Sequence, residues 1–391
     1  YRLPTTNYRL VRLWRKEEFW LSANDGSEGM RVLLISNMYP SKDSPNFGIF
    51  IKEQVDTLKQ KGVNFTLVVN TIKKGGWVSL FKYLLLFIKV IKASFYDFDL
   101  IHYHYLFPNG LLALIPYVLR RKPLIATAHG SDVNLVAKVG WIKRLNSLVF
   151  KHLSILICVS EDLASELQQV FQINPKKVLV VDCGVDTDIF KPEDKNRLRN
   201  LIGLSPSQKI VLYVGNLVLV KGVNYLIEAL PEIIKKHPEV YLVLIGSGPA
   251  LKDLQREVVA LNLEDYVRFE GAKPHWQIPR WMGAADVFVL PSEREGFGLV
   301  ALEAMACGVP VVASKVGGLT EFIEDGKDGF LINSGDKNAL VEKINYLLTN
   351  FKAYESISSA AREKALRYDI GIKAEKIKEI YEKVRRKELV R

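Results

Sequence analysis

One segment, residues 285–314, constrains the fold of this chain more than any other. It opens with an apolar run at 287–290, which predicts a buried strand. A loop with two glycines follows at 295–298. A helical stretch at 299–307 then ends at a glycine, as helices commonly do. A second apolar run at 309–313 closes the unit, so the segment predicts two parallel strands joined by a helix.

The rest of the chain repeats this alternation of apolar strands and helical patterns, which predicts an α/β protein. Further strands are expected at residues 32–36, 64–70, 100–103, 124–128, 155–159, 209–215, 240–245 and 267–270, and helices at 49–60, from 223 and from 250. The series restarts at Lys209, so we expect two doubly wound domains that are joined near residues 182–192. In such folds, ligands bind at the carboxyl ends of the strands.

Glu303 lies within the expected helix of the 285–314 segment. A carboxylate among apolar neighbours is costly unless a partner hydrogen-bonds to it, and the vicinal hydroxyls of a sugar would serve. The simpler interpretation is a solvated helix residue, which does not explain the apolar surroundings. Its helical neighbours are Leu299, Val300, Ala306 and Cys307.

The same segment carries a specific pattern of residues. Residues 291–313 read Pro-Ser-x-x-Glu-Gly-Phe-Gly-x-x-x-x-Glu-Ala-Met-Ala-Cys-Gly-x-Pro-Val-Val-Ala. This pattern resembles the nucleotide-sugar signature of the family 4 glycosyltransferases, which are retaining enzymes of GT-B fold. The resemblance runs from about Met30 to about Ile380.

The resemblance implies two Rossmann-like domains that face a central cleft. The expected division is an acceptor-binding domain at 30–187, a nucleotide-sugar-binding domain at 188–372, and a C-terminal helix at 373–391 that crosses back to the first domain. Residues 1–29 are expected to be an N-terminal extension, either native or upstream of the true start, and they lack the apolar core of a signal peptide.

The resemblance also assigns roles to individual residues. Glu295 is expected to hold the hydroxyls of the donor sugar together with the backbone of Phe297, Gly298 and Leu299, while Glu303 holds the ribose. The full donor-binding set implied by the resemblance is Gly48, Gly215, Asn216, Lys221, Gly246, Glu295, Gly296, Phe297, Gly298, Leu299 and Glu303.

Lys221 opens the helix that is expected from residue 223. A lysine beside a helix N-terminus can bind a diphosphate, and the resemblance gives Lys221 the leaving nucleoside diphosphate. Taken alone, a surface lysine at a loop tip is the simpler interpretation. Many family members carry an arginine where this chain has Asn216, so Asn216 would offer at most a neutral hydrogen bond.

Three histidines follow or occupy strands of the first half. The segment from Ala126 to Asn134 contains a His-Gly-Ser-Asp sequence, in which the resemblance places His129 beside the donor sugar as a polar positioning group. The residues expected to act at the reacting centre are therefore His129, Lys221 and Glu295. His102 and His104 alternate on a strand and share one face. They are expected to line the cleft, and the pattern supplies no third metal ligand.

The composition indicates which classes of partner and which compartment suit this chain. The net charge of +11 favours acidic partners, namely nucleotide phosphates, then anionic lipid, and last nucleic acid, for which no binding signature is found. The cysteines Cys158, Cys183 and Cys307 are isolated in sequence, which favours a reducing cytosol. No apolar run reaches the length of a membrane span.

Residues 76–95 predict a basic amphipathic helix. Lys82, Lys89 and Lys92 fall on one side of a helical wheel, and Trp77, Leu80, Leu84, Phe87 and Ile91 on the other. Such a helix can lie in an anionic membrane surface. It can equally pack against a core and expose its lysines. We expect peripheral binding to the cytoplasmic face of the membrane, with a lipid-linked or membrane-proximal acceptor.

The function expected from the resemblance is transfer of a sugar from a UDP- or GDP-linked donor to the hydroxyl of a glycan or glycolipid acceptor. The resemblance implies attack on the same face of the sugar. It also implies no covalent enzyme intermediate, no obligatory metal and no other cofactor. Three alternatives stay open: a nucleotide-sugar epimerase or phosphorylase, a dehydrogenase, and a non-catalytic nucleotide-sugar-binding protein. A dehydrogenase lacks support because the chain has no Gly-x-Gly-x-x-Gly fingerprint.

Overall fold

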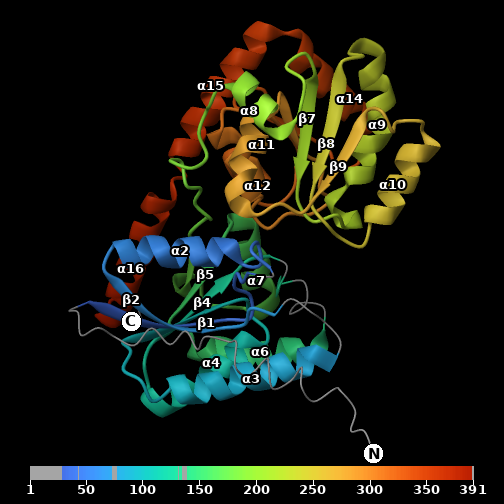
Figure 1. Cartoon of the computed structure of the whole chain (residues 1–391). Helices are drawn as coiled ribbons and strands as arrows, with labels where there is room; N and C mark the ends of the chain where they lie inside the picture. The colour runs from blue at the N-terminus through green and yellow to red at the C-terminus, as the bar shows by residue number, and fades with distance from the viewer. Residues whose placement is uncertain (1–28, 43, 73–76, 131, 134–138, 390–391) are drawn as a thin grey trace, which may run out of the picture.

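Two six-stranded parallel sheets organise the chain (Figure 1). The computed structural model describes residues 29–42, 44–72, 77–130, 132–133 and 139–389, so the predicted N-terminal extension lies almost wholly outside the described residues. The first sheet has the order β2-β1-β3-β4-β5-β6 and the second has the order β12-β11-β10-β7-β8-β9. The α/β fold with two doubly wound units, predicted above, is confirmed.

The N-terminal unit is built around the first sheet. Its strands are β1 (Met30–Ser36), β2 (Val63–Val69), β3 (Leu100–His104), β4 (Leu124–Ala128), β5 (Ile155–Cys158) and β6 (Val178–Val180). Its helices are α2 (Ile49–Gln60), α3 (Trp77–Ala93), α4 (Asn109–Arg120), α6 (Gly140–His152) and α7 (Glu161–Phe171). The helices α3, α4 and α6 cover the face of this sheet that is turned away from the C-terminal unit, as Figure 1 shows.

The C-terminal unit is built around the second sheet. Its strands are β7 (Lys209–Val214), β8 (Val240–Ile245), β9 (Val267–Gly271), β10 (Val287–Leu290), β11 (Val311–Ser314) and β12 (Phe330–Ile332). Its helices are α8 (Lys195–Ile202), α9 (Val223–Lys236), α10 (Leu251–Ala260), α11 (Ile278–Ala284), α12 (Leu299–Ala306), α13 (Leu319–Phe322), α14 (Lys337–Thr349) and α15 (Phe351–Leu366).

The β1 strand illustrates why these apolar runs form buried strands. Successive side chains of a strand point to opposite faces, so both faces of a covered parallel strand must be apolar. Val32 and Leu34 join the core beneath α2, whereas Leu33 and Ile35 join the core beneath α3 and α4. One continuous apolar run therefore contributes to two separate cores.

The sequence analysis did not predict two short edge strands, and it placed the start of one other strand too early. The β6 and β12 strands have three residues each, which is too short for a periodic pattern. The strand predicted at 309–313 begins only at Val311, because Pro310 has no N–H to donate to a ladder. The carbonyl of Pro310 still accepts from the N–H of Phe288, at 3.0 Å.

The chain crosses between the two units twice, and the crossings are bonded to each other. The N–H of Val185 donates to the carbonyl of Tyr368, and the N–H of Ile370 donates to the carbonyl of Val185, both at 2.9 Å. After the second crossing, helix α16 (Ile370–Arg385) packs beside α2 of the N-terminal unit (Figure 1). The prediction that the last helix crosses back is confirmed. Its predicted start at residue 373 is wrong, because the Asp369 carboxylate caps the helix by accepting from the N–H of Gly371 at 2.8 Å.

Candidate active site

The two units touch at a pair of glycines at the carboxyl ends of their strands. Gly130 follows β4 in the N-terminal unit, and Gly296 follows β10 in the C-terminal unit. A Cβ atom on Gly130 would lie 2.8 Å from the Cα of Gly296, and a Cβ on Gly296 would lie 2.5 Å from the carbonyl oxygen of His129. Real Cβ atoms do not approach other atoms so closely, so this contact between the units requires glycine on both sides.

Lys221 and Glu295 meet on the C-terminal side of this contact. The Nζ of Lys221 lies 2.5 Å from Oε1 of Glu295, and the hydroxyl of Ser292 donates to the same oxygen at 2.8 Å. Gly222 places Lys221 there, because it caps α9 in the left-handed region with a φ of 63°. The structure therefore brings together two of the three residues that the sequence analysis assigned to the reacting centre.

The loop after Glu295 leads directly into helix α12. Gly298 is its N-cap residue, with a φ of 89°, and no side chain caps the helix end. The first turn of α12, which starts at Leu299, therefore presents backbone N–H groups and the positive end of the helix dipole near Glu295. Phe297 itself is buried, so its ring packs inward while its backbone follows the loop.

Glu303 is buried, and its partner is a residue that the sequence analysis missed. Only 6% of Glu303 is exposed, and its Oε1 lies 2.9 Å from Nε2 of His275. The other ring nitrogen of His275 lies 2.8 Å from Glu53, which belongs to α2 of the N-terminal unit. Burial lowers the pKa of His275, but Glu303 and Glu53 outweigh it and raise the pKa to about 10.

The remaining predicted glycines make close backbone contacts of their own. A Cβ on Gly246 would lie 1.8 Å from the carbonyl oxygen of Gly215, so the loops after β7 and β8 pack directly on each other. Gly48 caps α2 with a φ of 73°, and a Cβ there would meet the backbone of Met38 at 2.8 Å. These contacts explain the glycines without a donor, and their donor-binding role stays a prediction. Asn216, next to Gly215, is exposed.

His129 belongs to a stack of aromatic rings in the N-terminal unit. Its Nε2 lies 3.0 Å from Nδ1 of His104, and the two rings stack with centroids 5.3 Å apart. The ring of Phe50 lies 4.9 Å away on another side. Burial lowers the pKa of His129 to about 3, so the ring is neutral at physiological pH. A neutral ring that is already hydrogen-bonded fits a positioning role better than that of a general base.

His102 extends this stack toward the crossing helix. Its ring centroid lies 4.4 Å from that of His104, as expected for two residues on one face of a strand. Both side chains are fully buried, so the prediction that they line the cleft is wrong. Its two nitrogens bond to the hydroxyls of Tyr381 and Thr127 at 2.6 and 2.7 Å. Among the residues that the structure describes, no group of His, Cys, Asp and Glu side chains could hold a metal ion.

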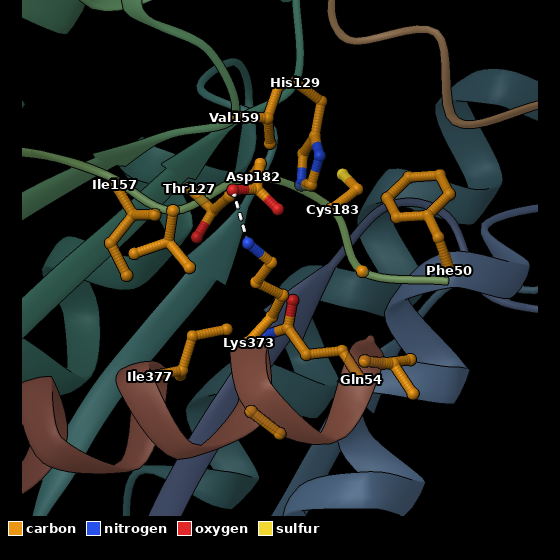
Figure 2. A pocket seen from close by; sticks show the side chains of 14 residues that line it. Phe50, Gln54, Thr127, His129, Ile157, Val159, Asp182, Cys183, Lys373 and Ile377 are labelled. Carbon is orange, nitrogen blue, oxygen red and sulfur yellow. Dashed lines mark hydrogen bonds and ion pairs between the residues drawn. The ribbon is translucent and has the colours of Figure 1, made fainter. Parts of the chain in front are cut away.

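A pocket lies beside His129, where the two chain crossings meet the N-terminal sheet (Figure 2). Lys373 at the start of α16 bonds to Oδ2 of Asp182 at 2.8 Å, which neutralises both charges. Within the described part of the chain, the Nε2 of Gln54 and the Oδ1 of Asp182 are buried and have no hydrogen-bond partner. A hydroxyl or a water in the pocket could accept from the first and donate to the second. Polar groups thus extend from the contact between the units to the two chain crossings.

Comparison with known proteins matches both halves of the chain. The family model described as Glycosyl transferases group 1 matches residues 194–364, and that described as Glycosyltransferase Family 4 matches residues 27–189. The N-acetyl-alpha-D-glucosaminyl L-malate synthase of Bacillus anthracis is 29% identical over 74% of this chain and 74% of the relative. The D-inositol 3-phosphate glycosyltransferase 2 of Catenulispora acidiphila is 33% identical over 73% of this chain and 70% of the relative.

Solved structures share the architecture. The sucrose-phosphate synthase of Thermosynechococcus elongatus has a TM-score of 0.75 at 23% identity, and the match covers 91% of this chain and 99% of that chain. The Anabaena protein Alr3699/HepE, solved in complex with UDP-glucose, has a TM-score of 0.74 at 25% identity, covering 90% of this chain and 99% of that chain. These similarities, together with the two sheets, fit the GT-B fold.

Proposed function

The chain belongs to the family 4 glycosyltransferases of GT-B fold, and on this premise we propose that it transfers a sugar from a nucleoside diphosphate donor to an acceptor hydroxyl with retention at the anomeric carbon. The observation that carries the proposal is the Lys221–Glu295 pair, which lies beside the glycine contact between the units. A donor offers both residues a new partner: sugar hydroxyls for Glu295 and diphosphate oxygens for Lys221.

The leaving diphosphate needs the most stabilisation, because negative charge develops on it as the bond to the anomeric carbon breaks. Lys221 and the N-terminus of α12 supply positive groups at this place. An acceptor hydroxyl that attacks from the same side can pass its proton to the departing diphosphate oxygen. No side chain then has to act as a base, which fits the lowered pKa of His129.

A donor screen followed by product analysis tests this proposal. Wild-type protein is first screened by thermal shift against UDP- and GDP-sugars, because a ligand at 100 times its Kd stabilises a protein by about 2.7 kcal/mol. The stabilising donor is then incubated with candidate acceptors, and NMR reads the anomeric configuration of the product. Inversion would refute retention, and turnover of the donor without any acceptor would favour the epimerase alternative.

The acceptor is proposed to lie at a membrane surface. The GDP-mannose-dependent alpha-(1-6)-phosphatidylinositol monomannoside mannosyltransferase of Mycolicibacterium smegmatis, a relative 33% identical over 65% of this chain, has a lipid acceptor in its name. The structure adds an apolar surface on α3. Leu86, Val90 and Ala93 face the core, whereas the stripe Leu84, Phe87, Ile88 and Ile91 is exposed.

The neighbouring helices α4 and α6 also expose apolar side chains. Leu84 is 54% exposed, and Trp141 on α6 is 60% exposed. Val118 and Leu119 on α4 and Leu148 on α6 are exposed as well. No helix among the described residues could span a membrane. An exposed apolar stripe beside lysines suits peripheral binding to an anionic leaflet, on the face that points away from the C-terminal unit.

Liposome co-sedimentation tests this docking. The wild type is compared at low and high salt with a Lys82/Lys89/Lys92→Glu variant and with a Leu84/Ile88→Ser variant. Charge reversal is expected to abolish the salt-sensitive part of binding, because each lysine near the surface contributes about 1 kcal/mol. A wild type that ignores anionic liposomes at low salt, or two folded variants that bind as well as it does, would refute the docking model.

A further inference from the structure

His275 lies in the loop between β9 and α11, where that loop meets the N-terminal unit. The backbone N–H of His275 donates to Oδ1 of Asn46 at 2.9 Å, and the side-chain amide of Asn46 donates to the carbonyl of Lys273 at 2.5 Å. Glu53, one turn into α2, lies 2.8 Å from Nδ1 of His275. The segment around the start of α2 therefore holds this loop by three contacts.

The other side of the His275 ring faces the C-terminal unit. Nε2 donates to Oε1 of Glu303 on α12, and the ring of Phe190 lies 5.3 Å from the imidazole ring. Both ring nitrogens thus face a carboxylate oxygen. Since a carboxylate can only accept, both nitrogens must carry a proton.

The Glu303 carboxylate keeps capacity for a ligand in this arrangement. A carboxylate has about four lone-pair sites on two oxygens. His275 occupies one site on Oε1 and fixes the orientation of the group, which leaves Oε2 for the two vicinal hydroxyls of a ribose. Removal of His275 would leave a buried carboxylate that is neither paired nor oriented.

We propose that His275 is a positioning residue that couples closure of the two units to nucleotide binding, by holding Glu303 of the C-terminal unit and Glu53 of the N-terminal unit at the same time. This inference rests on the proposed function, in which Glu303 receives the ribose. When the units separate, His275 loses Glu53. When they close, the second carboxylate fixes the ring and with it Glu303.

Two substitutions separate the two halves of this link. His275→Gln keeps roughly the size of the side chain but removes the positive charge and the pair of donors on two separate nitrogens. Glu53→Gln removes only the charge on the N-terminal side. His237→Gln is the matched control, because His237 also lies beside a glutamate, Glu239, at 3.5 Å, at the other end of the C-terminal sheet. Circular dichroism establishes that each variant is folded.

The readouts are the Kd of UDP and GDP by calorimetry, the donor KM and kcat, and the radius of gyration by X-ray scattering. His275→Gln is expected to raise the Kd of the preferred nucleotide and the donor KM at least about fivefold, with kcat changed less than about twofold. Glu53→Gln is expected to raise the Kd as well, by a smaller factor than His275→Gln does, and to increase the radius of gyration.

Unchanged nucleotide affinity in folded His275→Gln, or an unchanged radius of gyration in Glu53→Gln, would refute the coupling. A variant that does not fold is replaced by His275→Asn or Glu53→Asp, to which the same criteria apply. If the wild type binds no nucleoside diphosphate, the proposed function fails instead. The link between the units is then tested by X-ray scattering alone. The radius of gyration of His275→Gln must be larger than that of the wild type and that of His237→Gln.

Discussion

The two edges of the interdomain cleft contain different chemistry. The N-terminal side contains neutral rings, the stacked histidines His102, His104 and His129, of which His129 lines the pocket while His102 and His104 are fully buried. The C-terminal edge presents ion pairs, Lys221 with Glu295 and His275 with Glu303. A charged nucleotide therefore suits the C-terminal edge, and an uncharged sugar or acceptor hydroxyl suits the N-terminal edge.

The histidines show what sets this difference. Burial lowers the pKa of His102 and of His129 to about 3, and it lowers the pKa of His104 well below its ordinary value. Burial acts on His275 in the same direction, yet two carboxylates raise its pKa to about 10. Partner charge, rather than depth, decides whether a buried histidine is protonated.

The largest expected effect is a loss of stability in acid. The three neutral histidines have folded pKa values below the unfolded value of about 6.5, so their contribution is complete above that pH and is lost as the pH falls. Each of these histidines lowers the free energy of unfolding by up to about 1.4 kcal/mol for every pH unit below that value. Urea unfolding is expected to show a free energy that drops by several kcal/mol between pH 7 and pH 5.

The control is a variant that removes one titrating ring, His102→Gln, which can still bond to the hydroxyls of Tyr381 and Thr127. Its unfolding free energy should depend less steeply on pH than that of the wild type. His275 follows the opposite sign, because its raised pKa makes its contribution complete below about 6.5 and lost as the pH rises through about 10. A wild type with equal stability at pH 5 and pH 7 would contradict the neutral cluster.

The second-largest expected effect is a loss of turnover when the Lys221–Glu295 pair is broken. Lys221→Ala and Glu295→Ala are each expected to lower turnover at least about tenfold, equivalent to roughly 1.4 kcal/mol of transition-state stabilisation. Because the two side chains are bonded, each substitution also frees the other, so the double variant should lose less than the product of the single losses. Steady-state kinetics measures all three. Wild-type rates in both single variants would remove these residues from the reacting centre.

The smallest expected effect distinguishes the glutamate that is proposed to hold the ribose from the one that is proposed to hold the sugar. Glu303→Ala is expected to weaken binding of the bare nucleoside diphosphate several-fold, because a ribose contact does not require the sugar. Glu295→Ala should not weaken that affinity, because its proposed contact is to the sugar and its removal frees Lys221 for the diphosphate. Calorimetry with UDP or GDP compares the two variants directly, and equal affinities in both would abolish the distinction between these glutamates.

The sequence predicted helices and strands better than it predicted which distant side chains contact each other. Apolar runs predicted β4, β8 and β10 with their observed bounds, because a parallel strand buried on both faces is a continuous apolar run. It also placed Glu303 among apolar helical neighbours, and the structure shows Glu303 buried. It missed His275, since apolar periodicity reports which residues are buried but not which distant groups they bond to. A lone histidine in the sequence Lys-Pro-His-Trp gave no such signal.

The contact between Lys221 and Glu295 shows the same limit. Each residue was singled out by its own local motif, but only the packing of the loops after β7 and β10 brings them together. Likewise, the helical wheel of α3 separated lysines from apolar residues but could not tell which apolar side chains meet the core. The neighbouring helices decided that, and they left Leu84 and Ile88 exposed.

The crossing helix has a consequence for how the protein is made. Ile377, Ile380, Tyr381 and Val384 of α16 belong to the same core as Val32 and Leu34 of β1. A ribosome that has just finished the N-terminal sheet has not yet synthesised the helix that covers it. The C-terminal unit can bury its own core as soon as α15 emerges, whereas the N-terminal unit must wait for α16. The half of the enzyme that is synthesised first is therefore completed last.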